Sequence, residues 1–510
     1  MRVTSLLLIA ALLASSCADS SAVDVTAADG TAFGGGSDER PRDPVVWTPG
    51  WRQPAATAQD YGPVQIQLSN STLAYITRVA TPAEAMPQLA PGSTYLTYSL
   101  FVEETQAVEW FSLFVPGSPP PQRRPLLTAF HGFGTSHLDI VTRTSFFQEA
   151  QARDWFLIAP YQRNLAGGPG DISYGSAQSQ LHVEAVIRFV LQRYPIDRDR
   201  LYGVGFSMGG GAALSYAARH RSRATGAFAA VINHTGTVAL SDEYMNLLVG
   251  SLVTGYMETI FGGTPGTARF EWQRSSMLEL DAMAQIIPGG LHMAQNLRTV
   301  PVQTWFNVDD ELAHLVQQSE RLDQYLQGVP GAQHSVVAVP GGLANCDKQH
   351  CWDTLDQTAA CDWLEQQSLN SFPDEGAILA DRDGRWEYFD LTQELAGKFS
   401  RLTYGVDSDG NSLTLALPEN LARIRASWGA LGFDPVDPLK LTVEGFGFTP
   451  CPIEITGLPT TPSAVYHNSV LLAEDCSAGA AGPSWCFDAS TGTIVLLEDQ
   501  PAQSSWNVQF

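Results

Sequence analysis

The sequence predicts an α/β fold class: a doubly wound, mostly parallel sheet, followed by a smaller all-β region of the sandwich type. Across residues 46–368, short apolar runs alternate with segments of helical periodicity, which is the pattern of a buried parallel sheet covered by helices. From residue 369 to residue 510 the pattern changes to short strands of alternating polarity with turns between them. A chain of 510 residues is also too long for one typical domain, so we expect two.

The strands expected in the first part are apolar runs that end at turns. They cover 64–68, 125–130, 155–160, 226–232, 300–306 and 335–339, besides a run that begins at Leu201. A helix is expected over 182–194, where apolar residues recur at helical spacing until Pro195 ends the pattern. Residues 236–298 form a long segment between two strands, and such segments commonly become lids over an active site. Within this segment, residues 244–257 are expected to form one helix.

The run from Leu201 leads into a Gly-x-Ser-x-Gly motif centred on Ser207, and a helix-forming run of small residues follows. A strand before the motif and a helix after it are what a nucleophile elbow requires. Gly205 and Gly209 leave room for the crossing backbone, while the turn aims the helix N-terminus at any developing anion. We therefore predict that Ser207 is a nucleophile; the alternative is an ordinary glycine-rich turn.

The strand 125–130 ends at His131-Gly132-Phe133-Gly134. The backbone N–H that follows such a His-Gly pair commonly forms half of an oxyanion hole, beside the N–H of the residue after the nucleophile. The predicted donors are thus Phe133 and Met208. His131 is expected to brace the loop, because it precedes the nucleophile in chain order; the alternative for the whole segment is a plain turn.

An acid is expected after the nucleophile and before a histidine, since it must accept the imidazole N–H. Asp309 and Asp310 both follow the strand 300–306 and compete for this role, with Glu311 a weaker candidate.

Two histidines could complete a triad. His334 precedes the strand 335–339 and His350 follows it. The carboxyl ends of parallel strands open on one edge of the sheet, so we predict His350 as the base and keep His334 as the alternative. His314 is expected to be a surface or packing residue, and His234 either lines the pocket or is structural.

These motifs together resemble the α/β-hydrolase superfamily, and within it the secreted esterases related to polyhydroxybutyrate depolymerases and to feruloyl or acetylxylan esterases. The elbow is also similar to that of cutinase-like polyester hydrolases. The matching segments are 98–103, 114–117, 125–134, 196–211 and 350–352, within roughly residues 95–368. Phe306-Asn307 stands where the family usually has His-Gly, and Cys346 and Cys351 have no counterpart in the pattern.

The resemblance implies Ser207 as nucleophile, His350 as base, Asp310 as acid, and Phe133 and Met208 as oxyanion donors. The expected reaction is two-step acyl transfer through an acyl-enzyme, with no metal and no organic cofactor. A serine ester hydrolase is the leading interpretation. A serine peptidase of the prolyl-oligopeptidase type and a non-catalytic binding lipoprotein are the alternatives, and the choice among polyester, polysaccharide-linked and aryl esters stays open.

The N-terminus predicts export. A basic start and a short apolar run within residues 1–17 are typical of a signal peptide, and residues 14–17 resemble a lipobox whose Cys17 would carry the lipid. Ordinary cleavage near Ala18 is the alternative, so the protein is expected in the bacterial cell envelope or outside the cell. Residues 18–45 are expected to be a flexible linker.

The six remaining cysteines suggest three disulfides in an oxidising compartment. Three of them surround His350 and three lie in the C-terminal part, so either one bridge joins the two groups or each group leaves a free thiol. The six are Cys346, Cys351, Cys361, Cys451, Cys476 and Cys486. We expect a disulfide that pins the His350 loop; a zinc site there is the alternative, although its ligand spacing is poor.

The net charge of −24 argues against nucleic acid as a partner, because phosphate binding requires a basic surface. In the C-terminal part the expected strands cover 386–391, 413–417, 439–443, 494–497 and 505–510. The segment 407–411 is expected to be a hairpin turn, with calcium binding as the alternative. This part either binds a polymer or caps the first domain, and the sequence leaves oligomeric state open.

Overall fold

The computed structural model describes most of the chain beyond residue 64. The described ranges are 65–68, 73–80, 89–117, 122–162, 172–223, 225–247, 250–344, 346–369, 372–445, 451–477, 482–498 and 503–510. The predicted signal peptide, Cys17 and the linker 18–45 lie outside them. No helix in these ranges is long and apolar enough to cross a membrane.

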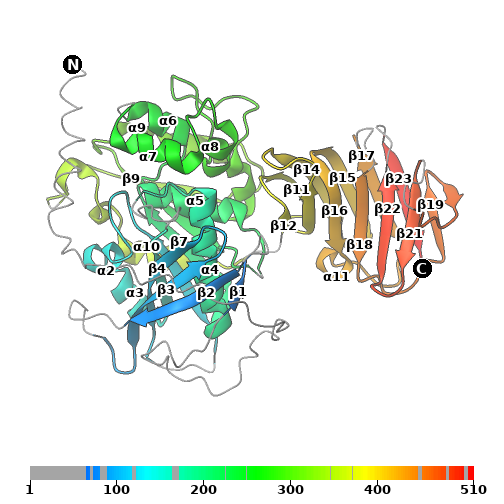
Figure 1. The fold of residues 1–510 in the computed structure, drawn as a ribbon, viewed down its shortest axis with the longest axis horizontal. Helices are drawn as coiled ribbons and strands as arrows, with labels where there is room; N and C mark the ends of the chain where they lie inside the picture. Colours follow the sequence, from blue (N-terminus) through cyan, green and yellow to red (C-terminus); the bar gives the residue numbers. More distant parts are fainter. Residues whose placement is uncertain are drawn as a thin grey trace.

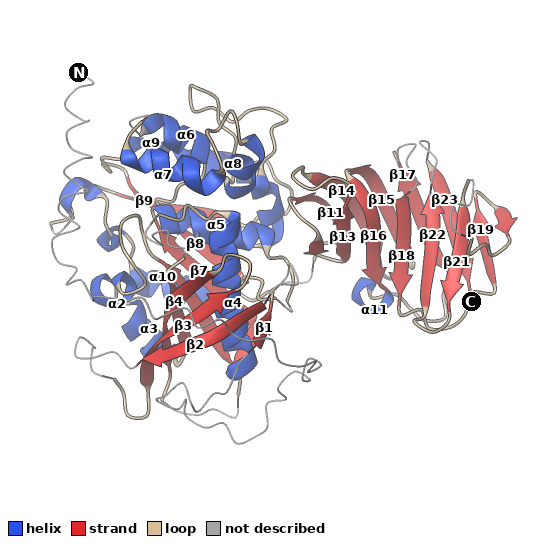
Figure 2. Cartoon of the chain, viewed as in Figure 1, coloured by secondary structure: helices blue, strands red, loops and turns tan. Residues whose placement is uncertain are grey.

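A ten-stranded sheet forms the first part of the molecule (Figures 1 and 2). Its strands are β1 (Gln65–Gln67), β2 (Leu73–Ala80), β3 (Thr94–Val102), β4 (Ala107–Val115), β5 (Arg124–Phe130), β6 (Phe156–Pro160), β7 (Ile196–Phe206), β8 (Ala230–His234), β9 (Val302–Asn307) and β10 (His334–Val339). Their order across the sheet is β1-β2-β3-β4-β6-β5-β7-β8-β9-β10. The strands β5 to β10 pair in parallel, whereas β1 to β4 pair antiparallel.

Helices cover both faces of this sheet. They are α2 (Asp139–Arg143), α3 (Phe146–Arg153), α4 (Ala177–Arg193), α5 (Met208–Arg219), α9 (Ala313–Gln327) and α10 (Gln357–Glu365). Neighbouring strand residues face opposite ways: Leu126 packs in one core cluster with α4 and α5, and Leu127 packs in another with α3 and α10. This is a doubly wound, mostly parallel sheet, so the predicted α/β fold class is confirmed.

The excursion between β8 and β9 forms a cap, which we define as residues 236–298. It holds α6 (Leu240–Asn246), α7 (Leu252–Phe261), α8 (Arg269–Ser275) and the 3-10 helix η2 (Met293–Thr299), which runs one residue past it. The prediction of one helix over 244–257 was wrong. Leu247 adopts an extended backbone that ends α6, and Ser251 caps a new helix, α7, by accepting the Thr254 N–H.

Residues 375–509, here called the β region, form two sheets. One has the order β11-β14-β15-β17-β23-β19-β20 and the other β12-β13-β16-β18-β22-β21. The strands are β11 (Glu375–Ala380), β12 (Gly384–Trp386), β13 (Phe389–Gln393), β14 (Ser400–Asp407), β15 (Ser412–Glu419), β16 (Leu421–Ser427), β17 (Leu439–Glu444), β18 (Cys451–Thr456), β19 (Ala464–His467), β20 (Val470–Leu472), β21 (Ser484–Asp488), β22 (Thr493–Glu498) and β23 (Ser504–Gln509), with a short helix α11 (Trp428–Leu431). Their buried faces share one apolar cluster, which confirms the all-β C-terminal part.

One expected strand in this region differs from the prediction, and one expected turn is found where it was predicted. The expected strand 386–391 is divided at Glu387, which has φ +54° and turns the chain back from β12 into β13. The expected hairpin turn at 407–411 joins β14 to β15, and Asn411 fixes it by donating hydrogen bonds to the carbonyls of Asp434 and Asp437.

The cysteines form two disulfides in the described chain, Cys346–Cys351 and Cys476–Cys486. Three disulfides are not formed: each group leaves one buried free thiol, Cys361 in α10 and Cys451 in β18, which was the stated alternative, and the expected disulfide beside His350 is present. Burial raises the pKa of both thiols to about 12, so neither is a ready thiolate.

Candidate active site

Ser207 lies at the turn between β7 and α5. Its backbone has φ +56° and ψ −123°, a strained conformation for a residue with a side chain. The turn is held from both sides, because the Ser207 N–H donates to the His234 carbonyl (2.9 Å) and the Ser207 carbonyl accepts from Gly210 (3.0 Å) and Thr237 (3.2 Å). These hydrogen bonds hold the Ser207 backbone in its strained conformation.

Two glycines beside Ser207 are required by close backbone contacts. A Cβ on Gly205 would lie 2.1 Å from the Gly209 carbonyl oxygen, and a Cβ on Gly209 would lie 2.4 Å from the carbonyl oxygens of both Phe130 and His131. The helix α5 therefore begins in direct backbone contact with the end of β5. This contact places the Ser207 turn next to the loop that holds Phe133.

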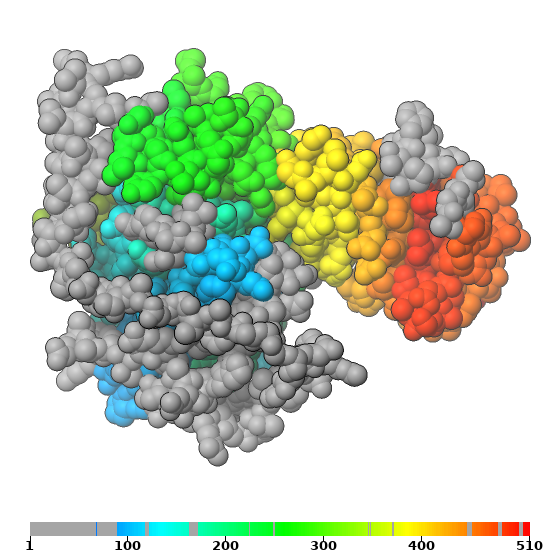
Figure 3. Space-filling view, viewed as in Figure 1, coloured from blue at the N-terminus to red at the C-terminus, as the bar shows by residue number. Residues whose placement is uncertain are grey.

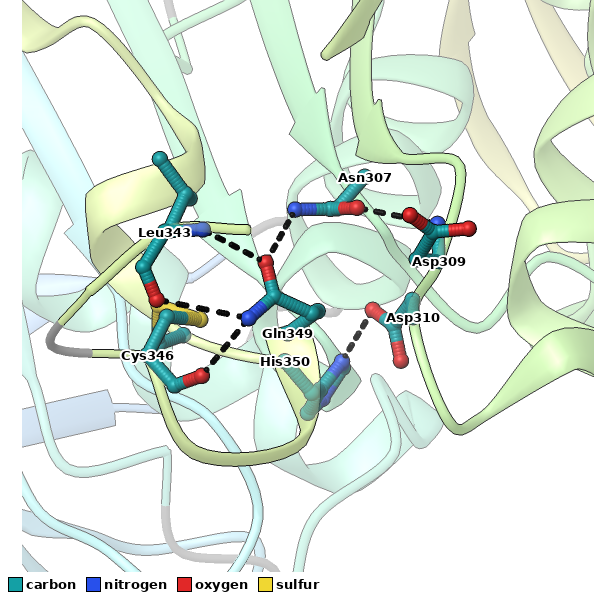
Figure 4. Close-up of a disulfide and its surroundings, with 8 residues drawn as sticks. Asn307, Asp309, Asp310, Leu343, Cys346, Gln349 and His350 are labelled. Atoms are coloured by element: carbon teal, nitrogen blue, oxygen red, sulfur yellow. Dashed lines mark hydrogen bonds and ion pairs between the residues drawn. A yellow bond between two sulfur atoms is a disulfide. The ribbon is translucent and has the colours of Figure 1, made fainter. Parts of the chain in front are cut away.

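The two aspartates after β9 have different surroundings. Asp310 is buried, and its Oδ1 accepts the Leu312 N–H (2.8 Å) while its Oδ2 lies 2.7 Å from His350 Nδ1. Asp309 is exposed. The structure thus joins Asp310, the residue favoured by the resemblance, to a histidine and leaves Asp309 in solvent (Figure 4).

His350 follows β10 and the short 3-10 helix η3 (Asp347–Gln349). Its Nε2 lies 3.0 Å from Ser207 Oγ, and its side chain is 16% exposed. The alternative, His334, begins β10 at the other edge of the sheet and pairs with Asp323 at 2.7 Å. Ser207, His350 and Asp310 therefore form one hydrogen-bonded line across the carboxyl ends of β7, β9 and β10.

The two expected oxyanion donors belong to the loop after β5 and to the start of α5. Met208 is the first residue of α5, and Phe133 follows β5 by three residues. Within the described ranges, neither backbone N–H has a hydrogen-bond partner. His131 is buried and braces this loop as expected, with Nδ1 2.8 Å from the Gly132 carbonyl oxygen and Nε2 3.1 Å from that of Tyr161.

An aromatic cluster supports the histidine. The Phe206 ring lies 4.6 Å from His350, 4.8 Å from His234 and 5.1 Å from Trp352, measured between centroids. His234 is fully buried, so it is a structural residue, not a pocket residue. Burial, and secondarily the charge of His350, lowers its pKa to about 3, and the ring is neutral at physiological pH.

The cap closes over the side of the site that holds Met208. Its buried side chains Leu240, Tyr244 and Met257 share one apolar cluster with Met208 and Tyr174, and Phe133 packs against that cluster. The cap is also joined to the sheet layer by Glu243 of α6, whose Oε2 lies 2.7 Å from His314 Nε2 of α9. His314 is therefore a packing residue, which is one of the two roles expected for it.

The possible metal sites of the sequence are not supported. Cys346 and Cys351 are bonded to each other, so their sulfurs are not free to ligate zinc beside His350. In the described ranges one further group has suitable spacing, Glu474 with Cys476 and Cys486, and its two sulfurs form a disulfide.

Two residues that were not among the predicted site residues connect the segment of Asp310 with that of His350. The side chains of Asn307 and Gln349 are hydrogen-bonded to each other at 3.0 Å (Figure 4). Asn307 contacts the segment that carries Asp310, and Gln349 contacts the loop that carries His350. The one available signal was Asn307, which stands where the family that the sequence resembles usually has His-Gly. Gln349 has no recognisable pattern around it.

The chain resembles several solved structures. It is 14% identical to an S-formylglutathione hydrolase from Agrobacterium tumefaciens, over 56% of this chain and 98% of that one, with a TM-score of 0.41. A ferulic acid esterase is 17% identical over 53% and 98% of the two chains, with a TM-score of 0.37. Acetyl xylan esterase 1 from a Thermoanaerobacterium species is 13% identical over 52% and 84%, with a TM-score of 0.35. No protein-family model and no curated protein sequence matches the chain.

Proposed function

We propose that this protein is a serine ester hydrolase that works through a Ser207–His350–Asp310 triad and an acyl-enzyme. The single observation that carries the proposal is the hydrogen-bonded line, with His350 Nδ1 2.7 Å from Asp310 and His350 Nε2 3.0 Å from Ser207 Oγ. Such distances let one imidazole orient on a carboxylate and remove a proton from a hydroxyl.

In the proposed reaction, His350 takes the Ser207 proton as Oγ attacks the ester carbonyl. The N–H groups of Phe133 and Met208 bind the resulting oxyanion, and the N-terminus of α5 adds to its stabilisation. The proton passes from His350 to the leaving alcohol. Water activated by the same histidine then releases the acid from Ser207, and Asp310 stabilises the imidazolium in both steps.

The surroundings of Ser207 favour an ester with an apolar acyl or aryl group. Met208, Phe133 and Tyr174 lie on the cap side of the nucleophile and belong to or pack on an apolar cluster. The solved proteins that the chain resembles include a ferulic acid esterase and an acetyl xylan esterase. We accordingly infer an aryl, polysaccharide-linked or polyester ester as substrate.

Hydrolysis of p-nitrophenyl acetate and butyrate tests the activity. We expect turnover by the wild type and a loss of about 10⁴-fold or more in each of Ser207→Ala, His350→Ala and Asp310→Asn. If the wild type is inert on both esters and cleaves a peptide series, the protein is a serine peptidase and not an esterase. If the wild type is inert on the esters and on the peptides, the remaining interpretation is a non-catalytic binding scaffold.

We also infer that residues 46–368 form the catalytic domain, that residues 236–298 are its lid, and that residues 369–510 form the second domain. The ten-stranded sheet and α10 end before residue 368, and the two sheets of the β region begin after it. Met257→Ala in α7, whose side chain packs in one apolar cluster with Met208, should change the ratio of butyrate to acetate hydrolysis if this segment acts as a lid.

We further propose that the protein is exported and carries a lipid on Cys17. The apolar run and the small residues before Cys17 support this proposal. Detergent-phase partitioning of the protein made in a bacterial host, beside Cys17→Ser, tests it. Wild-type protein in the detergent phase and Cys17→Ser in the aqueous phase are expected; equal partitioning of the two would contradict lipidation.

A further inference from the structure

The loop that carries His350 is strained in the residues just before the histidine. We call residues 341–352 the His350 loop. Lys348 has φ +59° and Gln349 has φ +56°, so two successive residues with side chains adopt left-handed backbone conformations. Such a pair persists only where its surroundings fix it. The position of the imidazole therefore depends on whatever holds Gln349.

The Gln349 side chain is fixed by four hydrogen bonds (Figure 4). Its Oε1 accepts from the Leu343 N–H at 3.0 Å and from Asn307 Nδ2 at 3.0 Å. Its Nε2 donates to the Leu343 carbonyl at 3.3 Å and to the Cys346 carbonyl at 3.0 Å. These contacts use both lone pairs and both hydrogens of the amide. The group therefore has one orientation and no unused hydrogen-bond donor or acceptor.

Asn307 connects this amide to the acid. It is fully buried at the end of β9, and its Oδ1 accepts the Asp309 N–H at 2.9 Å while its Nδ2 donates to Gln349. A backbone hydrogen bond from Glu311 to the Lys348 carbonyl (3.0 Å) runs beside it. The segments before Asp310 and before His350 are thus tied together independently of the contact between the acid and the base.

We propose that Gln349 and Asn307 are positioning residues that set the His350 imidazole in line between Asp310 and Ser207. This inference rests on the proposed function of the triad. Among the described residues neither side chain is hydrogen-bonded to Ser207, and both act through the backbone that carries His350. A misplacement of about 1 Å at a reacting group is enough to slow a reaction on the order of 100-fold.

The test measures labelling of Ser207 by a fluorophosphonate ester, in which Oγ bonds to phosphorus, fluoride leaves and His350 takes the proton. Gln349→Ala, Asn307→Ala and the double variant are compared in the wild-type background and in the His350→Ala background. We expect each single variant to be about 10- to 100-fold slower in the wild-type background, with the double variant close to the slower single one. In the His350→Ala background we expect less than about a 2-fold effect, because a residue that acts through His350 has nothing left to position.

Gln327→Ala is the matched control. Gln327 ends α9, is exposed and bonds only to the Asp323 carboxylate among the described side chains, so its loss should leave labelling within about 2-fold of wild type. Gln349→Met, which keeps the volume and removes the hydrogen bonds, replaces Gln349→Ala if that variant is not soluble.

Wild-type labelling rates in Gln349→Ala and Asn307→Ala would overturn the inference and leave the triad intact. Equal losses in both backgrounds would also overturn it, since they would mark a general structural defect. A wild type that is neither labelled at Ser207 nor active on esters would overturn the proposed function and this inference with it.

Discussion

The elbow glycines show how little space surrounds Ser207. We predict that Gly209→Ala lowers the free energy of unfolding by about 2 to 4 kcal/mol and lowers esterase activity by at least about 100-fold, because its Cβ would lie 2.4 Å from two carbonyl oxygens. Backbone atoms cannot rotate away, so the turn must open and Ser207 must move. Thermal unfolding and kcat on p-nitrophenyl butyrate measure the two effects.

Gly255→Ala is the control for this substitution. Gly255 lies inside α7, and a Cβ there would meet nothing within 4 Å. Alanine favours helices over glycine by up to about 1 kcal/mol, so this variant should be equal to or more stable than wild type. A Gly209→Ala variant as stable and active as Gly255→Ala would show that the close contact at the elbow is wrong.

His234 should make the protein sensitive to acid. Burial, together with the charge of His350, lowers its pKa to about 3, whereas an unfolded histidine has a pKa of about 6.5. Between these two values the unfolded chain binds a proton that the folded chain does not, so stability falls as the pH drops. His234→Phe has no such titrating group. Between pH 8 and pH 5 its free energy of unfolding should therefore rise by about 2 kcal/mol relative to that of the wild type. Urea unfolding at the two pH values measures it, and parallel pH profiles of the two proteins would contradict it.

Single residues of the site were predictable where chain order or strand direction constrained them. His350 was separable from His334 because the two lie at opposite ends of β10. Asp309 and Asp310 follow the same strand, and only the turn after β9 decides which carboxylate is buried. That decision depends on tertiary contacts, so spacing alone left both open.

At the scale of elements, the disulfide of the His350 loop should matter for activity more than for stability. Cys346 and Cys351 close a loop of separation 5, and Cys476 and Cys486 close one of separation 10 in the β region. Loops this short contribute about 2 to 3 kcal/mol each on entropic grounds. Replacing either pair by serines should lower the melting temperature to a similar extent.

The activities of the two variants should differ. Only the Cys346→Ser/Cys351→Ser variant frees the backbone on both sides of His350, so we expect its kcat to fall about 10-fold or more with a smaller change in KM. The Cys476→Ser/Cys486→Ser variant should keep wild-type kcat. Equal kcat values for both variants would contradict the role of the loop disulfide.

The elements that the sequence predicted less well are those whose bounds depend on backbone geometry. The core strands and α4 follow from apolar periodicity, and they lie within a few residues of their expected positions. The helix α6 ends because Leu247 adopts an extended backbone, and β12 is divided from β13 by the positive φ of Glu387. Neither leucine nor glutamate indicates such a backbone conformation in a sequence.

At the scale of the whole molecule, the β region is joined to the cap and the sheet layer by buried charges. Asp381 follows β11, is fully buried and pairs with Arg219 of α5 and Arg274 of α8 at 2.6 Å each. Nearby, Glu387 pairs with Arg298 at 2.5 Å. Figure 3 shows the cap, in green, meeting the start of the β region, in yellow, in a continuous surface. This favours a structural role for the β region over a loosely tethered binding module.

We predict that Asp381→Asn lowers the free energy of unfolding by about 3 to 5 kcal/mol at pH 7, because it leaves two arginines without a buried counter-ion. Burial would raise the pKa of Asp381, but Arg219 and Arg274 outweigh it and hold that pKa below its usual range. The stabilisation is therefore complete above an unfolded pKa of about 3.9 and is lost as the pH falls further. The difference between variant and wild type should shrink in urea titrations below pH 4.

Asp390→Asn is the matched surface control. Asp390 pairs with Arg385 at 3.0 Å, with its side chain 46% exposed, so its loss should cost less than about 1 kcal/mol. Equal effects of Asp381→Asn and Asp390→Asn would mean that the two parts of the molecule are not held together by buried ion pairs. Sequence reasoning could not foresee this interface, since its arginines and carboxylates come from segments far apart in the chain.

The most direct test of the central claim is the mass of the enzyme quenched with acid during turnover of p-nitrophenyl butyrate. We predict an added butyryl group on the peptide that contains Ser207, and no such group in Ser207→Ala or His350→Ala. Turnover without an acylated Ser207, or acylation that persists at the wild-type rate without His350, would contradict the proposed triad.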